Sequence, residues 1–85
     1  MANYSVVVKA SAAKELDAVP RKELQRIVKK IRALATNPRP NGCEKLSGAE
    51  RYRLRQGDYR IIYAIGDSVR QVIVVKIGHP RDVYR

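Results

Sequence analysis

The chain has 85 residues and a formal net charge of +10, because 18 lysines and arginines outnumber 8 aspartates and glutamates. A chain this short buries only about 60% of the surface that its unfolded form exposes, so we expect residues 1–85 to form one domain of modest stability and exclude a multidomain enzyme. The charge favours nucleic acid, an acidic membrane surface or an acidic protein as the partner, while no apolar run approaches the roughly 20 residues that cross a membrane.

The first half of the chain predicts one strand and two helices. A β-branched run at residues 4–8 indicates an edge or central strand. Ser11 is expected to cap a short helix that runs to Val19, and Pro20 ends this helix and opens the next. The second helix carries an apolar stripe at helical spacing: Leu24, Ile27, Val28, Ile31 and Leu34. We expect that stripe to pack on a sheet and the basic residues of the same helix to face solvent.

The second half of the chain predicts a loop and three strands. Residues 37–48 contain two prolines and two glycines and are expected to form the loop. Strands are expected at residues 52–56, 59–65 and 69–77, the last two joined near residues 66–68. The order is therefore β-α-α-β-β-β, an α+β fold in which two helices pack on one face of a small, largely antiparallel sheet.

A tight hairpin turn at Gly57 and Asp58 sets the register of two arginine-rich strands. Directly opposed residues share a face of the sheet, so this register sorts the side chains into two groups. One face collects Tyr52, Leu54, Ile61 and Tyr63, which we expect in the core. The other face collects Arg51, Arg53, Arg55 and Arg60 around Ile62. Four cations on one side of a hairpin repel one another, which predicts an anionic partner for this face.

The composition favours a phosphate or an acidic side chain as the ligand over a metal ion. Eleven of the 18 cationic residues are arginine, whose planar guanidinium grips phosphate or carboxylate at two points. Cys43 is the only cysteine and His79 the only histidine, and the carboxylates are scattered along the chain. Because this pattern matches neither a zinc site nor a magnesium site, we expect no metal and no cofactor.

Three sequence motifs follow one another along the second half of the chain. They are Lys45-Leu46-Ser47-Gly48, the hairpin sequence YRLRQGDYRIIY at residues 52–63, and KIGHPRDVYR at residues 76–85. Together they resemble the RelE branch of the RelE/ParE toxin superfamily, and the similarity extends over nearly the whole chain. The resemblance implies a RelE-like fold and the toxin half of a type II toxin-antitoxin system. It also implies cleavage of messenger RNA in the ribosomal A site by attack of a ribose 2′-hydroxyl, without a metal.

The resemblance further assigns roles to individual residues. Arg60 matches the family's strand arginine and would grip the scissile phosphate. Arg51 and Arg53 would orient the phosphate and hold charge, since a guanidinium is a poor general base. In the tail, Arg81 would lie near the leaving group and the ring of Tyr84 would stack on an A-site base. The expected RNA contacts also include Arg55, Lys45 and Lys76.

The C-terminal motif departs from the family at Pro80. Many relatives carry an arginine directly after the histidine, so one of two adjacent cations is missing here and activity could be weak. An imidazole exchanges protons readily at neutral pH, which makes His79 a candidate for proton transfer. A lone histidine at a strand end is more often a surface or capping residue, whereas the resemblance favours catalysis, because several superfamily members use a histidine in this Gly-His context. The general base and the general acid therefore stay open.

Two other functions are compatible with the same residues. A ParE-like toxin of the same fold would inhibit DNA gyrase without cutting RNA, although the ending Asp82-Val83-Tyr84 favours RelE. A non-catalytic RNA- or ribosome-binding module would need only the charge and the arginines. The toxin interpretation implies an acidic antitoxin and mRNA on the ribosome as partners, with operator DNA bound only by the toxin-antitoxin complex. Because the sequence shows no signal peptide or membrane span, we expect a cytoplasmic location.

Overall fold

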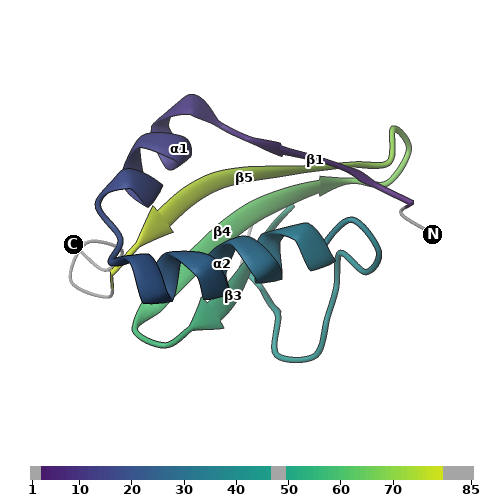
Figure 1. Cartoon of the computed structure of the whole chain (residues 1–85). Helices are drawn as coiled ribbons and strands as arrows, with labels where there is room; N and C mark the ends of the chain where they lie inside the picture. Colours follow the sequence, from purple (N-terminus) through teal and green to yellow (C-terminus); the bar gives the residue numbers. More distant parts are fainter. Residues whose placement is uncertain (1–2, 47–49, 80–85) are drawn as a thin grey trace.

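The structure, a computed structural model, describes residues 3–46 and 50–79. Its elements are β1 (Ser5–Val8), α1 (Ala10–Asp17), α2 (Arg21–Ala33), β2 (Glu44–Lys45), β3 (Arg51–Gln56), β4 (Tyr59–Gly66) and β5 (Gln71–Gly78). The five strands form one sheet in the order β1-β5-β4-β3-β2, and both helices lie on the same side of it (Figure 1). β1 pairs with β5 in parallel, and the other pairings are antiparallel. The predicted α+β class with two helices on one face is confirmed.

The β3–β4 hairpin has the predicted register. Gly57 adopts a positive φ of 58°, which glycine tolerates because it has no side chain. Gln56 lies opposite Tyr59, and the pairing continues without a shift to Tyr52 opposite Tyr63. The four residues predicted for the core are all buried: Tyr52, Leu54, Ile61 and Tyr63. The hairpin therefore sorts its side chains between the two faces as expected.

Both helices turn their apolar sides towards the sheet. α1 lies against β5 and buries Ala12, while α2 lies against β3 and buries Ile27 and Ile31. Leu24 and Val28 of the predicted stripe are only half-buried. The buried core comprises Ala12, Val19, Ile27, Ile31, Leu34, Tyr52, Leu54, Ile61, Tyr63, Ile65, Val72, Val74 and Ile77. No helix within the described residues is long and apolar enough to cross a membrane.

The predicted cap of the first helix is wrong by two positions. α1 begins at Ala10, with Lys9 rather than Ser11 as the residue before it. The amide of Lys9 donates to the carbonyl of Val74 in β5, which holds Lys9 in an extended conformation. The carbonyl of Lys9 then accepts a hydrogen bond from Ala13. A contact with a distant strand therefore sets the start of this helix, and local capping does not.

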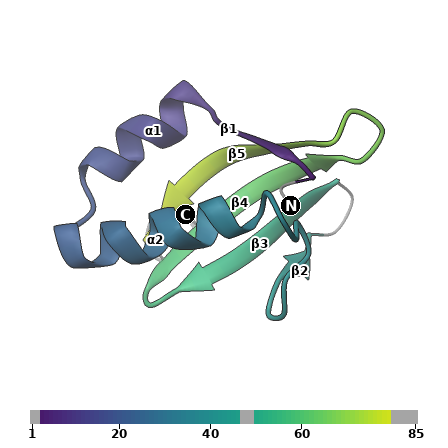
Figure 2. The same cartoon turned by 45° about the vertical axis from the view of Figure 1, so that its right-hand side comes forward.

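Two predicted boundaries in the second half also differ from the structure. Residues 37–48 were expected to be loop throughout, but Glu44 and Lys45 form β2 and pair with β3 at the edge of the sheet (Figure 2). Charged residues carry little strand signal, and here the pairing with the backbone of β3 forms the strand. The last strand begins at Gln71 rather than at Val69. Val69 lies in the preceding turn, where Arg70 adopts a positive φ of 51°.

A polar cluster joins the loop after α2 to the turn between β4 and β5. The guanidinium of Arg39 donates to both carboxylate oxygens of Asp67, at 3.2 Å to Oδ1 and 2.8 Å to Oδ2. It also donates to the hydroxyl of Tyr52 at 3.2 Å, and the hydroxyl of Tyr4 donates to Asp67 Oδ1 at 2.8 Å. The hydrogen bonds from Arg39, and then that from Tyr4, lower the pKa of Asp67 to about 2. Asp67 thus connects three parts of the chain while it is ionised.

We expect Asp67→Asn to lower the melting temperature at neutral pH, and we expect this difference to shrink as the pH falls from about 4 to about 2. A carboxyl group whose pKa is lowered on folding stabilises the fold above its ordinary pKa of 3.8, and that contribution is lost as the pH falls through the folded value of about 2. Circular dichroism melts of the wild type and the variant across this range measure the difference. A difference that stays constant down to the lowest pH would contradict the expectation.

Candidate functional site

The side of the sheet that faces away from the helices carries what we call the arginine face, defined as Arg51, Arg53, Arg55 and Arg60. Arg55 lies opposite Arg60, and Arg60 in turn lies opposite Gly78 of β5. Opposed side chains on neighbouring strands have Cβ atoms about 4.5–5.5 Å apart, so Arg55 and Arg60 can reach the same small anion. Arg55, Arg60 and Gly78 thus form a row across β3, β4 and β5. Because Gly78 has no side chain, no side chain from this position of β5 stands beside Arg60.

Burial distinguishes Arg60 from its neighbours on the arginine face. Only 8% of its surface is exposed, whereas Arg51 and Arg55 are exposed. Its Nη1 atom donates to the carbonyl oxygen of Asp58 at 3.5 Å. A side chain that is already held in one conformation loses little conformational freedom when it binds an anion. The face therefore has one buried guanidinium beside the half-buried Arg53 and the exposed Arg51 and Arg55.

A carboxylate also belongs to this face, and sequence analysis did not anticipate it. Glu44 of β2 lies opposite Arg53 of β3, and its Oε1 atom is 3.3 Å from Nη2 of Arg53. Glu44 offsets the charge of Arg53, so the positive field is strongest around the other three arginines. Glu44 reaches this face because β2 pairs with β3. The sequence around Glu44 carries no strand pattern, so this position could not be predicted from it.

The two lysines predicted to contact RNA are each paired with a carboxylate, and they lie on different faces of the sheet. Lys45 is opposite Tyr52, which puts it on the helix side of the sheet, and its Nζ atom is 3.4 Å from Glu50 Oε1. The Nζ atom of Lys76 is 3.1 Å from Oε2 of Glu15 in α1. Lys45 therefore lies outside the arginine face, whereas Lys76, which is opposite Ile62, lies on that face and has its charge offset by Glu15.

His79 follows β5 and packs on the helix side of the sheet. Its ring meets that of Tyr59 edge to face, with 5.6 Å between the centroids and an interplanar angle of 87°. Tyr59 precedes Arg60 in β4, and successive residues of a strand point to opposite faces. Both rings line a hollow of about 190 Å³ together with Glu15. The structure therefore does not bring the imidazole of His79 together with the guanidinium of Arg60.

The remaining predicted site residues are Arg81 and Tyr84, which lie outside the described residues, as does Pro80. Within residues 3–46 and 50–79, no three histidine, cysteine, aspartate or glutamate side chains gather closely enough to hold a metal ion. The chemistry available on the arginine face is therefore that of guanidinium groups. Such groups bind phosphate at two points and stabilise negative charge that develops on it.

Glu15 holds the end of β5, beyond the point where β1 stops pairing with it. β1 pairs with β5 from Ser5 to Val8, opposite Gln71 to Val74. Further along β5, the amide of Ile77 donates to Glu15 Oε1 at 3.0 Å, while Lys76 contacts the other carboxylate oxygen. A side chain of α1 thus replaces the missing strand partner at this edge. No local pattern in α1 could have identified Glu15.

We expect Glu15→Ala to loosen the end of β5. A hydrogen bond to a charged group contributes about 1.5–3 kcal/mol, and because this carboxylate is partly exposed we expect the lower end, or roughly tenfold faster amide exchange at Ile77. Glu15→Gln should have a smaller effect, since its amide oxygen can still accept the bond from Ile77. Hydrogen exchange followed residue by residue measures both variants. Equal exchange at Ile77 in the wild type and Glu15→Ala would show that the carboxylate does not hold the strand.

Comparisons with known proteins agree with this fold. The family model described as the ParE toxin of type II toxin-antitoxin system, parDE, matches residues 6–84. The chain is 32% identical over 84 residues to Toxin RelE of Mycobacterium tuberculosis, with 96% of this chain and 87% of that protein covered. The archaeal RelE-RelB complex from Pyrococcus horikoshii OT3 has a TM-score of 0.83 at 26% identity, over 91% of this chain and 94% of that chain. A mutant of the E. coli toxin RelE in the free state has a TM-score of 0.77 at 27% identity, over 99% and 92%.

Proposed function

Because the chain belongs to the ParE toxin family of type II toxin-antitoxin systems and is a RelE-like toxin within the RelE/ParE superfamily, we propose that it is an endoribonuclease that cuts messenger RNA in the ribosomal A site. The observation that carries the proposal is the row of Arg55 and Arg60 on the side of the sheet that the helices leave free. Gyrase inhibition is not favoured, since the relatives named above are RelE toxins.

The proposed reaction is attack of a ribose 2′-hydroxyl on the adjacent phosphorus. The new bond joins O2′ to phosphorus and the P–O5′ bond breaks, which leaves a 2′,3′-cyclic phosphate and a 5′-hydroxyl. The step needs the nucleophile aligned, the charge of the five-coordinate phosphorus stabilised and the leaving oxygen protonated. It needs no metal to balance its atoms and charges, because the proton lost by O2′ matches the proton gained by O5′.

We assign the stabilisation of charge to the arginine face. Arg60 would bind the scissile phosphate from its fixed position, and Arg51, Arg53 and Arg55 would hold the flanking phosphates. A donor aimed at developing charge is worth about 2.7–4 kcal/mol in comparable sites, so Arg60 would supply a sizeable part of the acceleration and its exposed neighbours less.

Proton transfer is assigned to the tail. Arg81 would stabilise charge on the leaving oxygen, because a guanidinium does not give up its proton, and Tyr84 would stack on the base in the A site, where its hydroxyl would assist proton transfer. Because His79 packs against Tyr59 on the helix side, it would act in catalysis only if it turned towards the arginine face. Pro80 removes one of the cations expected here, so we expect a slower reaction than in relatives that keep both.

An acidic antitoxin is the proposed partner that controls this activity. The archaeal structure that this chain resembles is a complex of RelE with RelB. A chain with a net charge of +10 attracts an acidic protein by the same electrostatic field that would attract RNA. We therefore propose that the toxin occurs in cells as a complex with its antitoxin, and that operator DNA is bound only by this complex.

Mapping of messenger RNA ends after induced expression tests the proposal. A nuclease of this class should produce cuts within translated codons, with 5′-hydroxyl ends that accept a radiolabel from polynucleotide kinase without prior phosphatase treatment. Ribosomes that lack translated message provide the control. No cuts are expected there, because the proposed cleavage follows the reading frame of a translated message. Intact messenger RNA together with altered DNA supercoiling would overturn the proposed nuclease activity and would indicate inhibition of DNA gyrase instead. Intact RNA with bound ribosomes would indicate a non-catalytic binding module.

A further inference from the structure

Lys76 lies in the same row of side chains as Arg53 on the side of the sheet that carries the arginines. Arg53 of β3 is opposite Ile62 of β4, and Ile62 is opposite Lys76 of β5. In the adjoining row, Arg60 is opposite Gly78. The two rows are two residues apart along each strand, so Lys76 is a diagonal neighbour of Arg60. Such neighbours lie about 7–8 Å apart, a distance that long side chains can span.

Lys76 differs from the arginines of these rows in the chemistry of its side chain. A guanidinium keeps its proton in proteins, so an arginine binds a phosphate but does not give a proton to an oxygen. A lysine ammonium carries three protons and can act as a general acid. At the other end of its row lies Glu44, opposite Arg53, and an ionised carboxylate only accepts hydrogen bonds. Within these two rows, all of whose residues the structure describes, the proton donor suited to catalysis is therefore Lys76.

The ammonium of Lys76 is held at an open edge of the sheet by a weak ion pair. β1 pairs with β5 only as far as Val74, and beyond it Nζ of Lys76 is 3.1 Å from Oε2 of Glu15. The two side chains are 42% and 31% exposed, and an ion pair that water reaches contributes little to stability. An RNA phosphate can therefore compete for the ammonium. The other oxygen of Glu15 still accepts the amide of Ile77, so β5 stays in place when Lys76 leaves.

We propose that Lys76 is the general acid that protonates the leaving O5′ oxygen. This role rests on the proposed nuclease function, in which Arg81 does not supply that proton. When RNA binds, the ammonium moves from Glu15 to the oxygen beside the phosphate that Arg60 holds. As the O2′–P bond forms and the P–O5′ bond breaks, one proton passes from Nζ to O5′. The proton of the 2′-hydroxyl passes to water, and the neutral amine takes a proton back from water, so atoms and charges balance.

Substitutions of Lys76 test the proposal in single-turnover cleavage on programmed ribosomes, with the full-length toxin in excess. Lys76→Gln and Lys76→Arg should both cut about 100-fold more slowly or worse, because general acid–base catalysis contributes about 10²–10⁴-fold. The toxin concentration at half-maximal rate should stay within about threefold for Lys76→Arg, which keeps the charge. Cleavage by Lys76→Arg at the wild-type rate would overturn the proposal, since Lys76 would then act by charge alone.

An RNA with sulfur in place of O5′ at the cleaved linkage isolates the protonation step. Sulfur leaves as a thiolate without first being protonated, because a thiol is a far stronger acid than an alcohol. Both Lys76 variants should therefore cut this RNA within about threefold of the wild-type rate. Losses of equal size on the sulfur and oxygen substrates would overturn the proposal. Circular dichroism shows whether each variant is folded, and Lys76→Met replaces one that is not.

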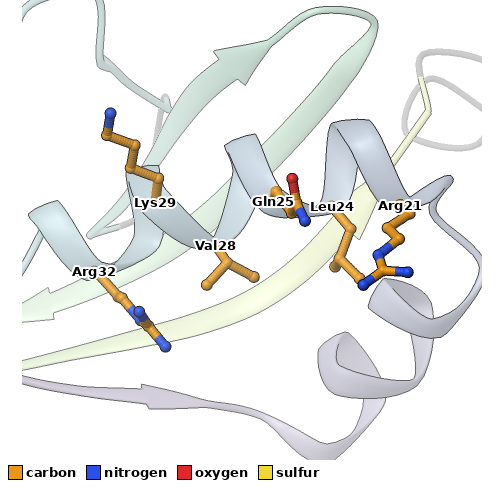
Figure 3. A pocket seen from close by; sticks show the side chains of 6 residues that line it. All are labelled: Arg21, Leu24, Gln25, Val28, Lys29 and Arg32. Carbon is orange, nitrogen blue, oxygen red and sulfur yellow. The ribbon is translucent and has the colours of Figure 1, made fainter.

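Lys29→Gln is the control for net charge. Lys29 is an exposed residue of α2 that lines a hollow of about 460 Å³ in the helix layer, and it points away from α1 and β1 (Figure 3). The helix layer covers the side of the sheet opposite the arginines. Lys29→Gln lowers the charge as much as Lys76→Gln does, and should slow cleavage less than about threefold. Equal losses in the two variants would overturn the proposal.

Glu15→Gln is the control for the ion pair. It removes the carboxylate that holds the ammonium, but keeps Lys76 and an acceptor for the amide of Ile77. We expect it to lose less than about fivefold. A loss as large as that of Lys76→Gln would mean that the lysine only braces β5, and the proposal would be wrong. Failure of the wild type to cut either RNA would overturn the nuclease itself, whereas wild-type cleavage by Lys76→Gln would overturn only the role of Lys76.

Discussion

Replacing Arg60 with alanine is expected to slow messenger RNA cleavage on programmed ribosomes by about 100- to 1,000-fold, the loss found when one preorganised donor is removed from a site that stabilises developing negative charge. Arg60 is the buried member of the arginine face and is already held against the Asp58 carbonyl. Its guanidinium would therefore meet the phosphate without first losing rotamer freedom, which makes it the arginine whose removal costs most. Single-turnover cleavage with toxin in excess over ribosomes measures the chemical step.

Arg55→Ala is the matched control for this experiment. It removes the same charge from the residue directly opposite Arg60, but from an exposed side chain. We expect a loss of about tenfold or less, since an exposed charge contributes little beyond long-range attraction. Ribosome binding should persist in both variants. Equal losses would mean that net charge alone matters, and cleavage by Arg60→Ala at the wild-type rate would exclude Arg60 from the reaction.

A third substitution separates charge from geometry. Arg60→Lys keeps the positive charge but replaces a planar fork of donors by a single ammonium group. If Arg60 grips the phosphate at two points, this variant should remain at least about tenfold slower than the wild type. Its circular dichroism spectrum and melting temperature show whether the buried position tolerates the change, which guards against a loss of activity that comes only from unfolding.

The central hairpin could be predicted from the sequence because its signals are local. Gly57 fixes the turn, and the period of two along the flanking strands then assigns each side chain to a face. The stripe of α2 was likewise visible as helical spacing. Each of these features needs only residues that are neighbours in the chain or across one turn.

Other features of the fold depend on contacts between distant segments and had no such signal. β2 exists because Glu44 and Lys45 pair with the backbone of β3, and α1 begins where it does because Lys9 bonds to Val74 of β5. Glu15 takes the place of a strand partner for Ile77, which lies 62 positions further along the chain. Sequence patterns of short range cannot encode such pairings.

The candidate site was predicted in part. Alternation placed four arginines on one face, but it could not show that Arg60 is buried while Arg55 is exposed. The family resemblance suggested that His79 and Lys76 would join the arginines. The structure turns His79 towards Tyr59 on the helix side, whereas Lys76 lies opposite Ile62 on the arginine face but donates to Glu15 of α1. Tertiary packing decides which of the charged residues near a site belong to it.

The largest expected effect on stability is that of Tyr63→Ala. Tyr63 is completely buried, stacks on Tyr52 with 5.8 Å between ring centroids, and donates its hydroxyl to the carbonyl of Pro38 at 2.8 Å. Removing a buried aromatic ring lowers the free energy of unfolding by about 3–5 kcal/mol, because apolar contacts are lost and a cavity remains. A domain of this length is stabilised by only roughly 4–13 kcal/mol, so the variant should be close to unfolded in the absence of a partner.

Tyr63→Phe separates the hydroxyl from the ring in the same experiment. The phenylalanine keeps the packing but leaves the buried carbonyl of Pro38 without this donor, at a cost of about 1–2 kcal/mol. Urea unfolding followed by circular dichroism should give midpoints in the order wild type, Tyr63→Phe, Tyr63→Ala, with similar slopes for all three. Equal midpoints for the two variants would mean that the bond to Pro38 carries the whole effect. The ring would then contribute nothing beyond holding its hydroxyl in place, against the expectation from its complete burial.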